Sequence, residues 1–150
     1  MTRHRKAKLL HGGHKGAEAE FGFNAARWGI EEVTYSFEGH IMARAENVHV
    51  LDADALRRGD VSMEIVSQRM GRTYTRGDKM RRIFQSIFHM VNEAHAVFAI
   101  GRIQEDDTVR GGTGWGVELA KFFNRPVSVY CQERSGWFGW EGGSWTPGAP

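Results

Sequence analysis

Residues 8–20 read KLLHGGHKGAEAE, and residues 96–118 read AVFAIGRIQEDDTVRGGTGWGVE. Each stretch starts with a short apolar run, passes through a glycine-rich turn and continues into a segment with helical composition. The run at 96–100 is continuously apolar, which is typical of a central parallel strand that is buried on both faces. Two segments with this order of strand, glycine turn and helix predict an α/β fold with a mainly parallel sheet.

Strand and helix periodicity recurs along the rest of the chain. The segments that show it are residues 17–29, 31–37, 48–51, 61–70, 79–94 and 127–130. We predict one Rossmann-like domain over residues 1–150, with a mainly parallel sheet of about four strands flanked by helices. Residues 1–7 are expected to form a basic tail, and residues 135–150, rich in glycine and tryptophan, a loop-rich aromatic tail. So thin a sheet favours a homodimer or a higher homo-oligomer.

Composition limits the classes of protein to which the chain can belong. Its 150 residues suit one domain, and a formal net charge of +2 argues against a dedicated nucleic-acid binder. No run of about 18 apolar residues is present, so no membrane span is expected. The start of the chain lacks the apolar core of a signal peptide, and Cys131 is the only cysteine. We therefore expect a cytoplasmic protein without an internal disulfide, in which Cys131 is a buried apolar residue.

The two glycine-rich turns are the candidate binding site. Glycine lets the backbone turn tightly and lets a ligand approach closely, while the start of the next helix presents free N–H groups and a positive dipole end. A phosphate is the natural occupant of such a turn. Neither turn matches the dinucleotide fingerprint or the P-loop, so hydride chemistry with NAD is not supported. The residues predicted to bind the ligand are Gly12, Gly13, His14, Lys15, Gly16, Arg110, Gly111, Gly112, Thr113, Gly114 and Trp115.

Other features of the sequence allow different interpretations. His11 and His14 lie three residues apart, but on a turn rather than a helix, and no second pair has ligand spacing. We therefore expect no metal and no cofactor, and place both histidines near the phosphate. Trp115 can either stack on a base or pack as an apolar anchor. Nucleic-acid binding through the basic start of the chain is a third, disfavoured class, which would show a steep dependence on salt.

Both glycine turns resemble motifs of one known family. Residues 110–118, Arg-Gly-Gly-Thr-Gly-Trp-Gly-Val-Glu, resemble the Pro-Gly-Gly-x-Gly-Thr-x-x-Glu motif of the LOG/SLOG superfamily of Rossmann-like nucleotide-binding proteins, and residues 93–100 resemble its strand entry. Residues 11–18 are similar to the early Gly-Gly-x-x-Gly-Ala-Asp turn of its sensor-type members. The chain departs from the family at Arg110, which replaces proline, and at Trp115, which replaces threonine.

The likeness extends over roughly residues 8–132, although only the two short motifs are specific. A polar insertion, residues 104–109, separates the strand from the second motif, and the family's usual first strand is absent. The superfamily includes the cytokinin-riboside phosphoribohydrolases. In these hydrolases the motif's glutamate and an upstream arginine act on the N-glycosidic bond, and the resemblance assigns these roles to Glu118 and Arg72, with Arg81 as the alternative arginine.

Two functions follow from the resemblance. In the first, the chain binds a phosphate-bearing nucleotide or nucleotide-derived signal, of the ADP-ribose or cyclic ADP-ribose type, as a sensor or sequestering protein. In the second, it is a nucleoside 5′-monophosphate phosphoribohydrolase, in which Glu118 stabilises an oxocarbenium-like ribose or positions water. Glu118 could instead accept a hydrogen bond from a ribose hydroxyl without catalysis, which would suit the binding protein. The altered Arg110 and Trp115 favour the binding protein, whereas the retained Glu118 favours the enzyme.

Overall fold

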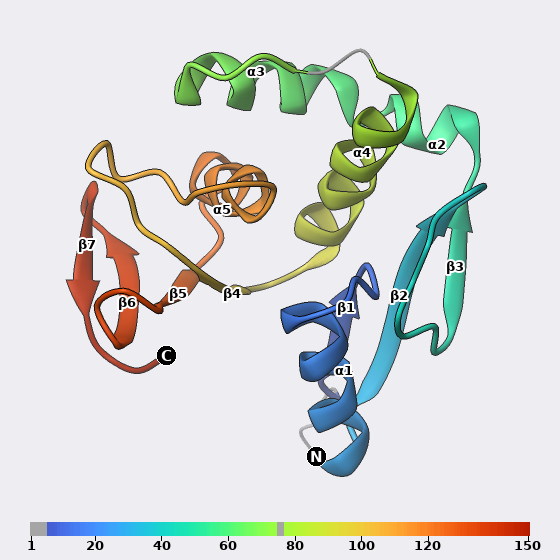
Figure 1. The fold of residues 1–150 in the computed structure, drawn as a ribbon, viewed down its shortest axis with the longest axis horizontal. Coiled ribbons are helices and arrows are strands. Elements are labelled where there is room, and N and C mark those ends of the chain that lie inside the picture. Colours follow the sequence, from blue (N-terminus) through green and yellow to red (C-terminus); the bar gives the residue numbers. More distant parts are fainter. Residues whose placement is uncertain (1–5, 75–76) are drawn as a thin grey trace, which may run out of the picture. The chain divides into compact units, whose positions relative to one another are not determined.

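The computed structural model describes residues 6–74 and 77–150 and divides into two compact units, Met1–Asp54 and Ala55–Pro150 (Figure 1). Most of the predicted basic tail lies outside the described residues. A single-domain organisation stays a prediction. Among the helices of the described residues, none is both long and apolar enough to cross a membrane.

The first unit is a parallel sheet with one helix packed on it. Its elements in chain order are β1 (Lys8–His11), α1 (Ala17–Arg27), β2 (Glu31–Phe37) and β3 (Val48–Leu51). The strands pair in the order β1-β2-β3, and all pairs are parallel. Helix α1 packs on β1 and β2. The glycine turn between β1 and α1 therefore lies at the carboxyl end of a parallel strand, as the sequence predicts.

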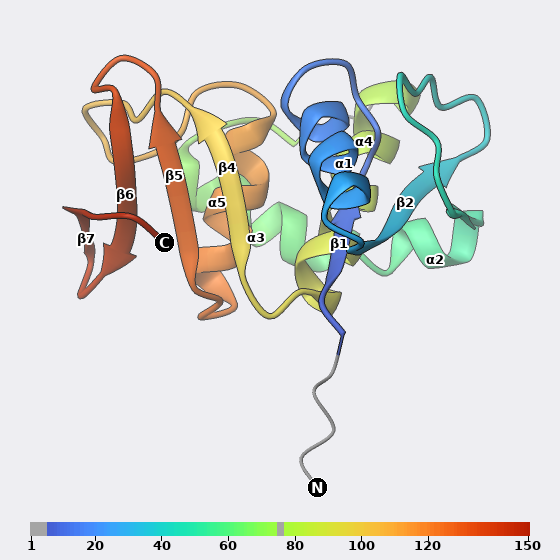
Figure 2. The same ribbon diagram turned by 90° about the horizontal axis from the view of Figure 1, so that it is seen from below.

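The second unit packs helices against a mixed sheet (Figure 2). Its helices are α2 (Ala53–Arg57, which begins at the end of the first unit), α3 (Asp60–Met70), α4 (Asp78–Glu93) and α5 (Thr113–Phe122), and its strands are β4 (Val97–Gly101), β5 (Val127–Cys131), β6 (Gly136–Glu141) and β7 (Ser144–Pro147). Helix α5 contacts β4 and β5, and α3 and α4 pack on α5. The core between these elements contains Met63, Val66, Val117, Leu119 and Val129, together with Cys131, which is buried as expected.

The α/β class is confirmed, but the predicted number of strands is too small. The described residues form seven strands, and the second sheet, in the order β4-β5-β6-β7, is parallel only between β4 and β5. Strand β4 is the first strand of this sheet rather than a central one. Phe98 is 49% exposed whereas Ala99 is buried, so only one face of β4 is covered in this unit.

The loop-rich tail predicted over 135–150 is wrong, because this segment is a β-hairpin. Strands β6 and β7 are joined by Gly142 and Gly143, and both glycines have positive φ angles, 58° and 82°. This is the backbone that a two-residue hairpin turn with the natural twist requires. Trp140 and Trp145 face each other across the hairpin, with ring centroids 5.1 Å apart. Cross-strand aromatic contact of this kind stabilises a sheet, and the sequence pattern did not reveal it.

Candidate functional site

The second glycine turn is exposed at the start of α5. After β4 the chain forms a short hairpin, closed by an antiparallel bridge between Ile103 and Val109, so the polar insertion is ordered. Gly111 then adopts a positive φ of 74°, and Gly112 is the N-terminal cap residue of α5. A side chain at either glycine would project into open space, and Gly111, Gly112 and Thr113 are exposed. A ligand can therefore reach the backbone of this turn.

Arg72, the first of the two arginines that the resemblance offers, lies against this turn. Its guanidinium donates hydrogen bonds to the carbonyl oxygens of Gly111 (3.1 Å) and Val109 (2.8 Å). It also donates to the side chains of Gln104 and Thr108. All four acceptors are neutral oxygen atoms, so Arg72 braces the turn. The hydrogen bonds from Thr108, and after them the charge of Arg72, lower the pKa of the nearby Asp106.

Only glycine fits at position 114, because Val109 and Arg72 pack directly against its backbone. A Cβ atom at this position would overlap the carbonyl oxygen of Val109 and would lie 2.8 Å from Nη1 of Arg72. Of the glycines in the second motif, Gly114 therefore serves the fold. Gly111 and Gly112 instead leave the turn open to solvent.

Trp115 and Glu118 are largely buried, and their contacts are with residues outside the exposed turn. The ring of Trp115 is 4% exposed and stacks on Phe84, with centroids 4.3 Å apart, which favours the packing role over base stacking. The side chain of Glu118 is 13% exposed, and its Oε2 lies 3.2 Å from Nζ of Lys121. That ammonium lies 3.8 Å from the centroid of the Trp140 ring, which ties Glu118 to the C-terminal hairpin.

Arg81, the alternative arginine, belongs to a different cluster. It forms an ion pair with Asp60 at 2.9 Å, and Asp60 also accepts hydrogen bonds from Tyr74 (2.8 Å) and Gln85 (2.9 Å). Burial raises the pKa of Asp60, but the hydrogen bonds from Arg81, Tyr74 and Gln85 outweigh it and hold the pKa below its usual range. This cluster joins α3 to α4, so Arg81 has a structural partner of its own.

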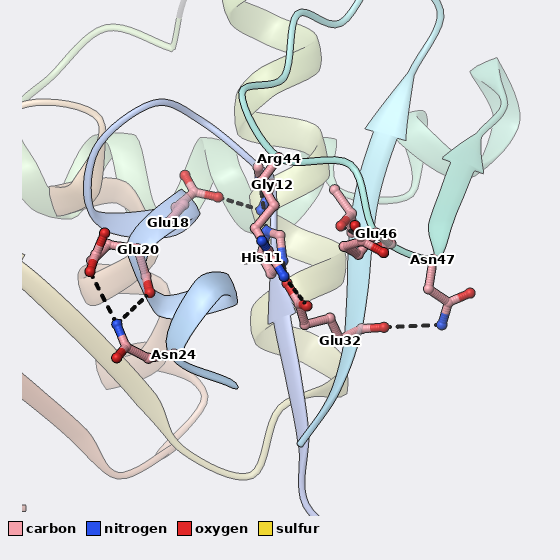
Figure 3. Close-up of polar contacts among 11 residues, drawn as sticks. His11, Gly12, Glu18, Glu20, Asn24, Glu32, Arg44, Glu46 and Asn47 are labelled. Atoms are coloured by element: carbon pink, nitrogen blue, oxygen red, sulfur yellow. Dashed lines mark hydrogen bonds and ion pairs between the residues drawn. The ribbon is translucent and has the colours of Figure 1, made fainter. Parts of the chain in front are cut away.

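The first glycine turn is closed by its own side chains (Figure 3). The amide of Gly12 donates to the carboxylate of Glu18, which reaches back from α1, and the amide of Gly13 donates to Nδ1 of His11 (2.9 Å). Both glycines are buried. The carbonyl oxygen of Gly13 accepts hydrogen bonds from the amides of Ala43 and Arg44. An anion bound at this turn would be repelled by the carboxylate of Glu18, which already accepts the hydrogen bond of the Gly12 amide.

A buried ionic network supports the first turn. Arg44 donates two hydrogen bonds of 2.6 Å to the carboxylate of Glu32, and Nε2 of His11 lies 3.0 Å from the same carboxylate (Figure 3). Glu32 is 6% exposed at its side chain. The hydrogen bond from Arg44 is the largest influence on the pKa of Glu32, which is lowered although burial opposes the shift. The motifs of the sequence pointed to neither Glu32 nor Arg44.

The other predicted residues of the first turn divide into two groups. Lys15 and Gly16 are exposed at the start of α1. His14 is half-buried, and its Nε2 lies 3.2 Å from Nε2 of His40, a residue that follows β2. Burial and the neighbouring His14 ring lower the pKa of His40 to about 4, so the His40 ring is neutral near pH 7.

No family model, curated protein or solved structure matches this chain. The LOG/SLOG resemblance therefore rests on the two motifs themselves.

Proposed function

We propose that this chain binds a phosphate-bearing nucleotide or nucleotide-derived signal, of the ADP-ribose or cyclic ADP-ribose type, and acts as a sensor or sequestering protein. The phosphate binds at the second glycine turn, residues 111–114. The observation that carries the proposal is an exposed Gly111-Gly112 turn, braced by Arg72, at the start of a helix. We also propose that the fold is Rossmann-like and that the likeness of residues 110–118 to the LOG/SLOG motif reflects this binding function.

Electrostatics favour an anion at this turn. The amide groups and dipole of a helix N-terminus attract negative charge, and the guanidinium of Arg72 adds a positive charge beside it. In α5, which the structure describes completely, the first turn contains no acidic residue. In α1, by contrast, Glu18 and Glu20 lie in the first turn. A phosphate at the first glycine turn would have to displace the carboxylate of Glu18 from the amide of Gly12.

Gly112→Val tests the proposal. The backbone of Gly112 is helical (φ −61°) and its Cβ position is open, so valine fits the free protein but crowds a ligand. Gly139→Val is the matched control, because Gly139 in β6 also has an open Cβ position. The purified protein is incubated with AMP, ADP-ribose, NAD and cyclic ADP-ribose isomers, and thermal shift and chromatography follow binding and the fate of each compound.

We expect one of these ligands to raise the melting temperature of the wild type and of Gly139→Val, but not that of Gly112→Val. Chromatography should recover this ligand intact. A folded Gly112→Val protein with wild-type affinity would exclude the phosphate site. A lack of response to every compound would mean that the turn serves folding or another anion.

The second candidate function is the phosphoribohydrolase, which one observation favours. Oε2 of Glu118 is buried, and among the described residues it has the ion pair with Lys121 but no contact with the geometry of a hydrogen bond. A carboxylate with unused hydrogen-bonding capacity suits a catalytic role. Release of free base during the incubation would identify this activity. Glu118→Gln should then abolish turnover and spare affinity, whereas the exposed control Glu133→Gln should leave both unchanged.

A further inference from the structure

His14 and His40 form a close pair in the first unit, outside the proposed phosphate site. They are 26 residues apart in sequence, and their Nε2 atoms are 3.2 Å apart. His14 belongs to the glycine turn, and His40 follows β2 and stacks on Phe37, with centroids 4.4 Å apart. His11 is not part of this pair, because its Nε2 contacts Glu32 and its Nδ1 accepts from the amide of Gly13.

A hydroxyl group lies beside the other ring nitrogen of His40. Nδ1 of His40 is 3.1 Å from the hydroxyl oxygen of Ser36, which is also 3.5 Å from the carbonyl oxygen of Phe37. In the tautomer in which Nδ1 donates to this hydroxyl, Nε2 presents a lone pair towards His14. An imidazole whose other ring nitrogen is held by an oxygen atom is the usual arrangement of a metal-binding histidine.

The distances fit two nitrogens that share one metal ion. Bonds of about 2.05 Å from a zinc ion to nitrogens 3.2 Å apart enclose an angle of about 100°, close to tetrahedral. The ring centroids of His14 and His40 are 4.8 Å apart, with the ring planes inclined at 66°. The 3.2 Å contact is also a hydrogen-bond distance, so the experiment has to distinguish a shared metal ion from a hydrogen bond.

Glu18 adds negative charge beside the pair. A Cβ atom on Gly12 would lie 2.8 Å from Oε2 of Glu18 and 3.6 Å from Nε2 of His14. The carboxylate of Glu18 and the imidazole of His14 therefore lie on the same side of Gly12, which places a negative charge near the pair. Among the described residues, no group of three or more histidine, cysteine, aspartate or glutamate side chains is placed to hold a metal.

We propose that His14 and His40 bind a divalent cation of the zinc class through their Nε2 atoms, with water in the remaining positions. Imidazole ligands suit zinc, copper and nickel rather than magnesium or calcium. The open positions leave room for an anionic or nitrogen-containing ligand on the metal. The site is independent of the phosphate-binding function proposed above, since its residues all lie in the first unit.

The test uses the full chain without a histidine tag, after treatment with a chelator. Isothermal titration with Zn²⁺ should give one ion per chain, and Co²⁺ should produce visible d–d absorption. His14→Ala and His40→Ala should each weaken Zn²⁺ binding at least tenfold, and Ser36→Ala about 10–100-fold through the loss of the hydrogen bond to Nδ1. His95→Ala, which changes an exposed histidine, should bind Zn²⁺ like the wild type.

A second measurement needs no variant. In long-range ¹H–¹⁵N spectra of the wild type, Zn²⁺ should shift the Nε2 signals of His14 and His40 together, and Mg²⁺ should shift neither. The proposal is overturned if the wild type binds no Zn²⁺, if a folded His14→Ala protein keeps wild-type affinity, or if His95→Ala weakens binding as much as His14→Ala does. In each of these cases the two rings share only a hydrogen bond.

Discussion

Glu32→Gln is expected to destabilise the chain strongly, because it removes the anion of the buried network in the first unit that joins His11 to Arg44. The carboxylate of Glu32 receives two hydrogen bonds of 2.6 Å from Arg44 and lies 3.0 Å from His11. A glutamine at this position keeps the shape and one acceptor oxygen, but turns its amide group, a donor, towards a second donor.

The size of the effect follows from the hydrogen bonds that the substitution removes. In the variant the amide oxygen can still accept from His11 and from Nε of Arg44, which both contact Oε1, but without the negative charge. The third interaction, from Nη2 of Arg44 to Oε2, becomes a contact between two donors. Each hydrogen bond to a charged group contributes about 1.5–3 kcal/mol, and breaking a buried ion pair costs about 3–5 kcal/mol. The side chain of Arg44 is 20% exposed and so recovers some hydration. We expect the free energy of unfolding to fall by about 3–4 kcal/mol.

Glu31→Gln is the control, on the neighbouring residue of β2. Glu31 lies 3.9 Å from Lys8, and both side chains are more than half exposed, so this ion pair contributes about 0–1 kcal/mol. Urea unfolding followed by circular dichroism measures both variants, and hydrogen exchange of residues 6–54 locates the change. If Glu32→Gln loses no more stability than Glu31→Gln, the network is not a source of stability.

The pH dependence gives an independent check. Because Arg44 and His11 lower the pKa of Glu32, the folded state holds this carboxylate charged at a pH where the unfolded chain is already protonated. Its stabilisation is complete above the pKa of the unfolded carboxyl group and is lost as the pH falls through the lowered pKa of the folded state. The difference between wild type and Glu32→Gln should therefore shrink on acidification, and a constant difference would contradict the reasoning.

Three further predictions follow from single contacts. The metal-free His40 ring should titrate near pH 4 by NMR, and stability should fall by at most about 3 kcal/mol between pH 6.5 and pH 4, because the unfolded chain binds the proton first. Gly114→Ala should lower the free energy of unfolding by more than about 2 kcal/mol in urea titrations, because its Cβ overlaps the carbonyl of Val109. Lys121→Met should lower the melting temperature by leaving Glu118 buried without its cation, and adding Glu118→Gln should restore part of the loss.

Local periodicity was sufficient to predict most elements of both units. The alternation of Val33, Tyr35 and Phe37 predicted β2, and apolar residues three and four apart predicted α4, each with boundaries within one residue of those observed. These patterns are readable because a strand or helix that covers a core must repeat its apolar residues with its own period. Neither pattern depends on which element lies beside it.

The C-terminal hairpin was missed because its pattern is aromatic and glycine-rich rather than aliphatic. Residues 136–141 read GWFGWE, with no clean alternation of apolar and polar side chains. The useful signal was the pair Gly142-Gly143 between two tryptophans, since a two-residue turn with positive φ angles fixes the register that brings Trp140 opposite Trp145. The residues of the turn, rather than the periodicity of the strands, determine the structure of such a segment.

The sequence located the glycine turns but not the partners that decide what they do. Arg72 does reach the second turn, 39 residues further along the chain, yet its hydrogen bonds go to two backbone carbonyl oxygens and two neutral side chains, which no motif predicts. Glu32, Arg44 and His40 join the first turn from separate segments, and only tertiary packing brings them there. Glu32 lies on the face of β2 opposite Val33 and Tyr35, where a charged residue is ordinarily expected to meet solvent.

The two glycine turns illustrate why a motif does not by itself define an anion site. Both follow a parallel strand and precede a helix, so the backbone of each provides amide groups and a dipole that favour negative charge. In the first turn the chain supplies that charge itself, through Glu18 on the amide of Gly12. In the second turn the first turn of the helix contains no acidic residue, and the guanidinium of Arg72 contacts the carbonyl oxygen of Gly111. The second residue of the helix therefore distinguishes a turn completed by its own carboxylate, with Glu18 in α1, from the turn at which we propose that a phosphate binds, with Gly114 in α5.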